Sequence, residues 1–86
     1  LASRKLRRDI EFQREAVRAL IRLDPNEAQE MLLALGNSKD AALRTLVISA
    51  FGKVSSEVSL VRRIEALVDP AWQVRSAALR SLGKER

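Results

Sequence analysis

The chain has neither cysteine nor histidine among its 86 residues. The absence of cysteine excludes disulfides and thiol nucleophiles, and the absence of both excludes the usual zinc sites and imidazole acid–base catalysis. Carboxylates and lysines remain, but their spacing does not cluster them. We therefore expect no enzyme, no cofactor and no metal site.

Aromatic residues make up only 3% of the chain, and the apolar runs are a few residues long, too short for a membrane span. No secretory or lipidation signal is visible, and the chain begins with Leu1, so we expect residues 1–86 to be one domain of a longer protein. No residue identifies the compartment, and we favour the cytoplasm. The composition, 47% apolar and 31% charged, is typical of an ordered domain.

Two stretches of the chain follow the same pattern, one at residues 43–53 and the other 31 residues later, at 74–84. Apolar positions fall on apolar positions, Arg44 on Arg75 and Gly52 on Gly83. A fixed period of roughly 20 to 50 residues indicates an architecture of repeated supersecondary units.

Helical spacing of the apolar residues predicts five helices and no strand. The expected ranges are about 4–23, 26–36, 39–53, 56–68 and 70–84. Asp24-Pro25 and Asp69-Pro70 give the same start signal, a capping aspartate followed by proline. We expect Gly36 to close the second helix in the left-handed conformation. The inward positions expected for the fourth helix are Val58, Val61, Ile64, Leu67 and Val68.

The segment from Asp69 to Gly83 has an aspartate, then a Val-Arg pair that ends six residues later at Arg75, then a run of alanine and leucine that closes on glycine. It resembles the first helix of a HEAT repeat. In the second unit Arg44 is kept, but Ser38 stands six residues before it; in the first unit Arg8 occupies that position. The resemblance covers about residues 9–84 and implies an all-α fold, a short right-handed α-solenoid of about two and a half helix pairs.

In HEAT-like units the recurrent aspartate and arginine are structural. The resemblance therefore implies that Arg44 and Arg75 belong to a ladder of hydrogen bonds and ion pairs between neighbouring units, not to a ligand site. Asp24 and Asp69 are expected to act as helix caps.

The resemblance also implies a scaffold that binds another protein on its concave face, which the second helix of each pair lines. The predicted contact residues are Glu27, Glu30, Arg62 and Arg63, with Glu65 beside them. Trp72 is a candidate binding hot spot. In the alternative interpretation, which we prefer, Trp72 packs as a lid over the turn between repeats. The last helix keeps apolar residues without a following helix, which indicates a route to self-association.

The alternative function is nucleic-acid or phosphate binding. Most of the net charge of +5 lies in the first helix, where Arg14, Arg18 and Arg22 recur every four residues along one side. Such a basic stripe is a footprint for phosphates. The competing interpretation is a solvated face on which Glu11 and Glu15 neutralise the arginines, and we favour it, so nucleic acid is the less favoured partner.

Overall fold

The computed structural model describes residues 2–24 and 27–83. Within these residues it contains helices and turns and no strand, which confirms the all-α prediction. The elements are α1 (Ala2–Leu23), α2 (Gln29–Leu35), α3 (Ala41–Phe51), α4 (Glu57–Glu65), the 3₁₀ helix η1 (Ala66–Val68) and α5 (Trp72–Gly83). The predicted start of the second helix at Pro25-Asn26 and the predicted end of the last helix at residue 84 lie outside the described residues. The other predicted ends agree to within one helical turn.

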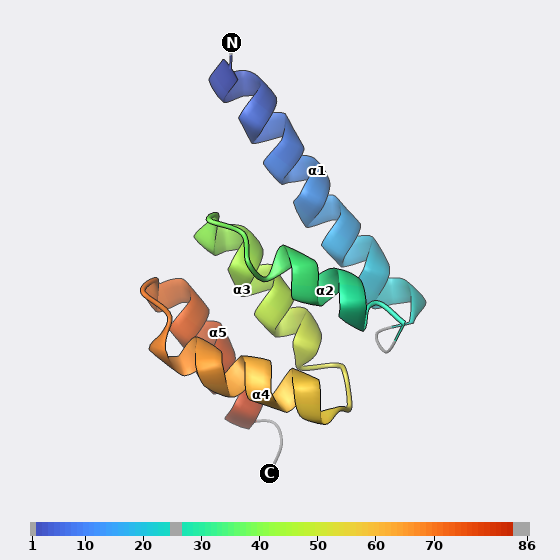
Figure 1. Ribbon diagram of the computed structural model, residues 1–86, viewed down its shortest axis with the longest axis vertical. Helices are drawn as coiled ribbons and strands as arrows, with labels where there is room; N and C mark the ends of the chain where they lie inside the picture. The colour runs from blue at the N-terminus through green and yellow to red at the C-terminus, as the bar shows by residue number, and fades with distance from the viewer. Residues whose placement is uncertain (1, 25–26, 84–86) are drawn as a thin grey trace.

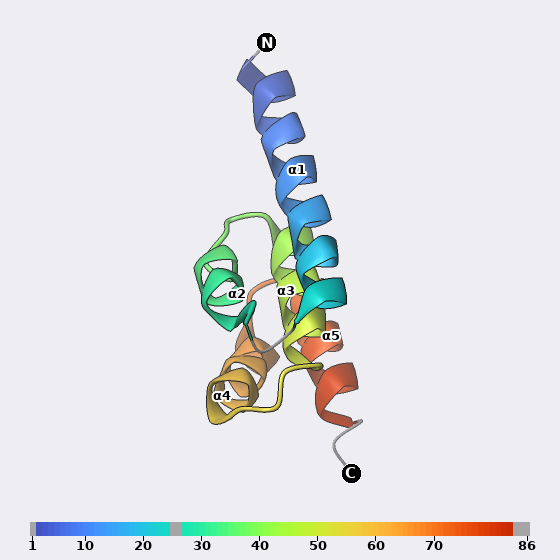
Figure 2. The same cartoon turned by 90° about the vertical axis from the view of Figure 1, so that its right-hand side faces the viewer.

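The helices form two layers. α1, α3 and α5 lie in one layer, and α2 and α4 lie together in the other, as the side view shows (Figure 2). α3 is the central element, because it packs against each of the other four helices (Figure 1). The chain therefore alternates between the layers and stacks helix pairs in the manner of a solenoid, as the 31-residue period predicts.

The hydrophobic core lies where α3 meets its neighbours. Val47 and Phe51 of α3 are at most 1% exposed, and so are Val17 of α1, Leu32 of α2 and Ala78 of α5. Short helices such as α2 are only marginally stable alone in water, and most of their stability comes from burying an apolar face against a neighbour. Burial against α3 therefore fixes where the other four helices lie.

The N-termini of α3 and α4 are capped by polar side chains. Asp40 is the N-cap of α3, and its carboxylate accepts hydrogen bonds from the amides of Ala42 (3.3 Å) and Leu43 (3.2 Å). Ser56 is the N-cap of α4, and its hydroxyl accepts from the Ser59 amide at 3.1 Å. Each cap satisfies amides that would otherwise lack a partner, which sets where the helix starts.

The left-handed conformation expected at Gly36 is wrong. Gly36 has φ −65° and ψ −13°, and the chain leaves α2 through a tight turn in which the Ser38 amide donates to the Leu35 carbonyl at 3.1 Å. Glycine is used for space: a Cβ at Gly36 would lie 3.2 Å from the Leu32 carbonyl oxygen and 3.5 Å from Cγ1 of Val47. The tight distance is therefore to a carbonyl of α2 itself, whereas the distance to Val47 of α3 is an ordinary van der Waals contact.

The inward face expected for the fourth helix is also wrong. Val58, Val61, Ile64 and Val68 are exposed, by 40 to 83%, and Leu67 alone of the five expected positions is partly buried against the core. The buried side of α4 and η1 is formed by Ser59, Arg63 and Ala66. These residues are small or hydrogen-bonded: the Ser59 hydroxyl donates to the Phe51 carbonyl, and Arg63 Nε donates to the Ser59 carbonyl at 3.3 Å. A buried polar group that has its hydrogen bonds costs little, so hydropathy alone mispredicts this face.

Among the described residues, no helix is both long enough and apolar enough to cross a membrane.

Candidate functional site

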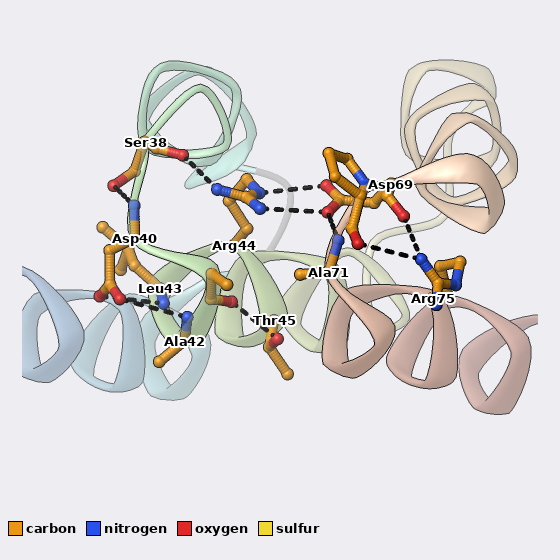
Figure 3. Close-up of polar contacts among 11 residues, drawn as sticks. Ser38, Asp40, Ala42, Leu43, Arg44, Thr45, Asp69, Ala71 and Arg75 are labelled. Atoms are coloured by element: carbon orange, nitrogen blue, oxygen red, sulfur yellow. Dashed lines mark hydrogen bonds and ion pairs between the residues drawn. The ribbon is translucent and has the colours of Figure 1, made fainter.

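The most ordered polar feature is a ladder of arginines and aspartates that links successive helices of the first layer. Nη2 of Arg14, on α1, lies 2.9 Å from Oδ2 of Asp40, the cap of α3. Arg44, on α3, holds Asp69 in the same way just before α5 (Figure 3). Each aspartate thus receives the arginine of the preceding helix, and we call these residues, with Arg75, the Asp–Arg ladder.

The bond between Arg44 and Asp69 is bidentate. Nε donates to Oδ2 at 3.0 Å and Nη2 donates to Oδ1 at 3.1 Å, while Nη1 donates to the Ser38 carbonyl at 2.9 Å. The two side chains are only 18% and 14% exposed. Two parallel charge-assisted bonds in a mostly buried setting fix both distance and orientation between α3 and α5.

Asp69 also accepts the Ala71 amide at 2.8 Å. Burial acts to raise the pKa of Asp69, but the hydrogen bonds from Arg44 and Ala71 and the positive charges of Arg44 and Arg75 outweigh it. The pKa of Asp69 therefore lies below its usual value of 3.8. These contacts support the expected structural role of the ladder.

A pocket of about 170 Å³ opens between α2 and α4, and we call it the central pocket. Its floor is apolar, with Leu33 of α2, Ile48 of α3 and Val74 of α5 among the lining residues. Its polar wall comes from both ion pairs of this region, Arg44 with Asp69 and Arg62 with Glu65, the second at 3.6 Å. The central pocket thus combines an apolar floor with charges of both signs.

One exposed side of α4 and η1 is apolar. Val58, Val61, Ile64 and Val68, which we call the α4 apolar face, recur at helical spacing and are all exposed. Met31 of α2, in the same layer, is 53% exposed. Contiguous apolar surface next to polar groups is typical of a binding surface in a folded protein.

The predicted contact residues are divided by the structure. Arg62 and Glu65 are exposed and line the central pocket; Glu27 and Glu30 are exposed but do not line it. Arg63, expected to be exposed, is only 2% exposed and belongs to the core side of α4. The reason is the orientation of α4 on the core, in which valine and isoleucine face outward and Arg63 faces inward.

The lid interpretation of Trp72 is wrong, because its side chain is 66% exposed. Trp72 is the first residue of α5 and does not line the central pocket. Exposure leaves the hot-spot interpretation open without testing it.

The basic stripe of α1 is largely occupied within the chain. Arg14 belongs to the ladder and its side chain is only 31% exposed, and Nη1 of Arg18 lies 2.6 Å from Oε1 of Glu15. Arg22 alone of the three has no ion pair among the described residues. Two of the three arginines of the stripe therefore already have a carboxylate partner within the chain.

Sequence reasoning missed the α4 apolar face and the apolar floor of the central pocket. Arg14, Arg44 and Arg75 recur at intervals of 30 and 31 residues, and this period signals the ladder and not the pocket. That spacing indicated which helices the ladder would join. The described residues contain no group of three or more acidic side chains placed to hold a metal ion.

Comparison with known proteins agrees with this geometry. No curated protein and no solved structure matches the chain. A family model of HEAT repeats matches residues 3–83, which include all five helices but for the first residue of α1. The repeated Asp–Arg ladder, the two layers and this match together show that the chain belongs to the HEAT repeat family.

Proposed function

We propose that this chain is a protein-interaction module that binds a segment of another protein on the layer formed by α2 and α4. HEAT repeats are commonly protein-interaction scaffolds, and the observation that carries the proposal for this chain is the α4 apolar face beside the central pocket. Leaving four aliphatic side chains exposed on α4 and η1 costs solubility, and a partner that covers them offsets this cost.

The central pocket favours a protein partner over a small ligand. Its volume of about 170 Å³ is below the roughly 300 to 1,000 Å³ of small-molecule sites. It is large enough for one or two side chains of a bound segment. The ion pair of Arg62 and Glu65 at its edge offers both a donor and an acceptor, so the segment would carry an apolar anchor flanked by polar groups.

The test compares two surface variants with matched controls. Val61→Glu places a charge on the α4 apolar face, and Arg62→Glu reverses the charge at the pocket edge. The controls, Ser49→Glu and Lys53→Glu, make charge changes of the same size at exposed positions at and just after the C-terminal end of α3. All four sites are exposed, so circular dichroism should show an unchanged helix content.

Proteins retained by the immobilised wild-type chain would be identified by mass spectrometry, purified and titrated by calorimetry. We expect Val61→Glu and Arg62→Glu to raise the dissociation constant by roughly ten-fold or more, as for central interface residues, and the controls to leave it unchanged. A partner that binds all four variants equally, or that is lost only with the controls, would contradict this binding surface.

A further inference from the structure

A second hollow, of about 150 Å³, lies between α3 and α5 within the first layer. We call it the α3–α5 hollow, and its lining residues are Ser49, Gly52, Lys53, Ala77, Arg80 and Ser81. No residue of α2 or α4 is among them, and the hollow shares no residue with the central pocket. It is therefore separate from the surface proposed above for a protein partner.

The floor of the hollow is formed by small residues. Gly52 has no side chain, and a Cβ there would lie 3.2 Å from Cβ of Ser81. Ala77 and Ser81 of α5 are themselves buried. The Ser81 hydroxyl donates to the Ala78 carbonyl at 2.9 Å, so its proton is already used within α5. Donors for a ligand must therefore come from the rim.

The rim carries two cations and a hydroxyl without partners. Lys53 follows the end of α3, and Arg80 lies in the last turn of α5. Both are exposed, and neither forms an ion pair among the described residues. The exposed hydroxyl of Ser49 has no hydrogen bond in the described part of the chain either. α3 and α5 contain no acidic residue, so neither helix supplies a carboxylate to neutralise the rim.

We propose that the α3–α5 hollow binds the phosphate monoester group, as free phosphate or on a phosphorylated side chain of another protein. Lys53 and Arg80 bind the phosphate oxygens from the two helices that form the hollow, and the Ser49 hydroxyl donates a further hydrogen bond. Charge-assisted hydrogen bonds to phosphate are the strong class, and both lysine and arginine form them. A phosphate monoester carries a charge of about −1.5 to −2 at pH 7 and three acceptor oxygens, which matches two cations and a hydroxyl.

The size and lining of the hollow favour a single phosphate over larger ligands. Its volume of about 150 Å³ is below the roughly 300 to 1,000 Å³ of small-molecule sites, so it holds a charged group and not a whole nucleotide. Nucleic acids are bound by many cations along the backbone, and single strands also by aromatic side chains that stack on the bases. The hollow has two cations and no aromatic residue in its lining.

A purely structural role for the two cations predicts a different result. Lys53 and Arg80 both lie at the C-terminal ends of helices, where a positive charge interacts favourably with the helix dipole. Loss of either charge would then lower helix stability without any effect on a ligand. Phosphate binding has to be measured directly to separate the two roles.

The experiment is a titration of the 86-residue chain with inorganic phosphate at low ionic strength, followed by the amide shifts in NMR spectra. We expect the largest shifts at Gly52, Lys53, Arg80 and Ser81, with a dissociation constant in roughly the millimolar range, because exposed charges each contribute little. A peptide with one phosphoserine should shift the same amides, and its unphosphorylated form should not. Phosphopeptide binding should weaken below about pH 6, where the phosphate takes up a proton.

The two phosphate sources are separated by affinity. A phosphopeptide that binds more tightly than inorganic phosphate would identify a phosphorylated protein as the ligand, and equal affinity would identify phosphate itself. An unphosphorylated peptide that binds equally well, or a DNA duplex that binds these residues more tightly than either phosphate source, would overturn the proposal.

Lys53→Glu and Arg80→Glu should each raise the dissociation constant for phosphate by roughly ten-fold or more, because each places a like charge beside the anion. Lys53→Gln and Arg80→Gln should weaken binding less, and they test the site even if a reversed charge disturbs a helix end. Lys39→Glu is the matched control, because Lys39 is an exposed lysine between α2 and α3 without an ion pair among the described residues.

Val61→Glu, which tests the protein-binding surface, should leave phosphate binding unchanged, so either proposal can fail without the other. Circular dichroism checks that each variant keeps its helix content. No shifts with phosphate, shifts spread evenly over the exposed lysines and arginines, or an equal effect of Lys39→Glu and Lys53→Glu would overturn the site.

Discussion

At the scale of the residue, the aspartates of the ladder serve two neighbours at once. Asp40 accepts the amides of α3 and the guanidinium of Arg14, and Asp69 accepts the Ala71 amide and the guanidinium of Arg44. Asp40 therefore both caps α3 and ties it to α1, and Asp69 ties the turn before α5 to α3. Arginine suits this role better than lysine, because its planar guanidinium can bind a carboxylate through two parallel bonds.

Asp69→Asn should destabilise the chain markedly. The amide cannot accept both bonds from Arg44, and the mostly buried guanidinium loses its counter-charge. We expect the free energy of unfolding to fall by about 1 to 3 kcal/mol, measured by urea denaturation followed by circular dichroism. Glu30→Gln, which changes the same functional group at an exposed site of α2, should change it little. Equal effects of the two variants would count against a stabilising ladder.

The lowered pKa of Asp69 also predicts a pH dependence. The folded chain holds this proton more weakly than the unfolded chain, whose aspartate titrates near 3.8. The stabilisation is therefore complete above that value and is lost as the pH falls through the lower folded pKa. We expect urea denaturation at a series of acidic pH values to show a smaller loss of stability for Asp69→Asn than for the wild type. The same loss in both chains would mean that other carboxylates cause it.

At the scale of the element, the contact between α3 and α5 depends on small residues. A Cβ at Gly52, the residue after α3, would lie 3.2 Å from Cβ of Ser81 on α5 and 3.1 Å from the Ser49 carbonyl oxygen. Ala77 and Ala78 of α5 are buried in the same region. The absence of a side chain at Gly52 therefore sets how closely the two helices approach.

Gly52→Val should separate these helices. The branched side chain has no space between the Ser49 carbonyl and Ser81, so we expect a loss of about 1 to 3 kcal/mol in the free energy of unfolding, as for other overpacked sites. Gly83→Val is the control, because a Cβ there meets no atom within 4 Å. Thermal unfolding followed by circular dichroism measures both variants, and an equal change in both would show that the loss of glycine itself, and not the contact, is responsible.

The helices themselves could be predicted from residue spacing, but the orientation of α4 could not. Valine and isoleucine at positions 58, 61 and 64 indicated an inward face, and the structure buries Ser59 and Arg63 instead. Burial of Ser59 is possible because its hydroxyl donates a hydrogen bond to the carbonyl of Phe51, the last residue of α3. Hydropathy counts the polarity of a side chain but not the partner that satisfies it.

At the scale of the whole molecule, packing is uneven along the first layer. α3 touches every other helix, whereas the N-terminal half of α1 extends beyond α3, away from the other helices (Figure 1). Arg8, Asp9, Glu11 and Phe12 are all exposed there. A helical segment without tertiary contacts is only marginally stable in water.

Native-state hydrogen exchange should reveal this gradient. We expect the amides of Val47 and Phe51 to exchange only through global unfolding, and those of residues 8–12 to exchange through local fraying at far lower free energy. Amide exchange followed by NMR at low concentration measures both groups. Equal protection of α1 and α3 in the monomer would contradict the gradient.

Residue spacing alone is enough to predict the helices, the repeat period and the ladder. These depend on local spacing: apolar residues at helical intervals, an aspartate shortly before α3 and another before α5, and Arg44 and Arg75 at equivalent positions of successive units. The tertiary structure is needed to show which side of α4 faces the core, and that Arg14 pairs with Asp40 instead of adding its charge to the basic stripe. These features depend on which groups meet across helices, and a contact between distant residues is fixed by packing and hydrogen bonding, not by the pattern within either segment.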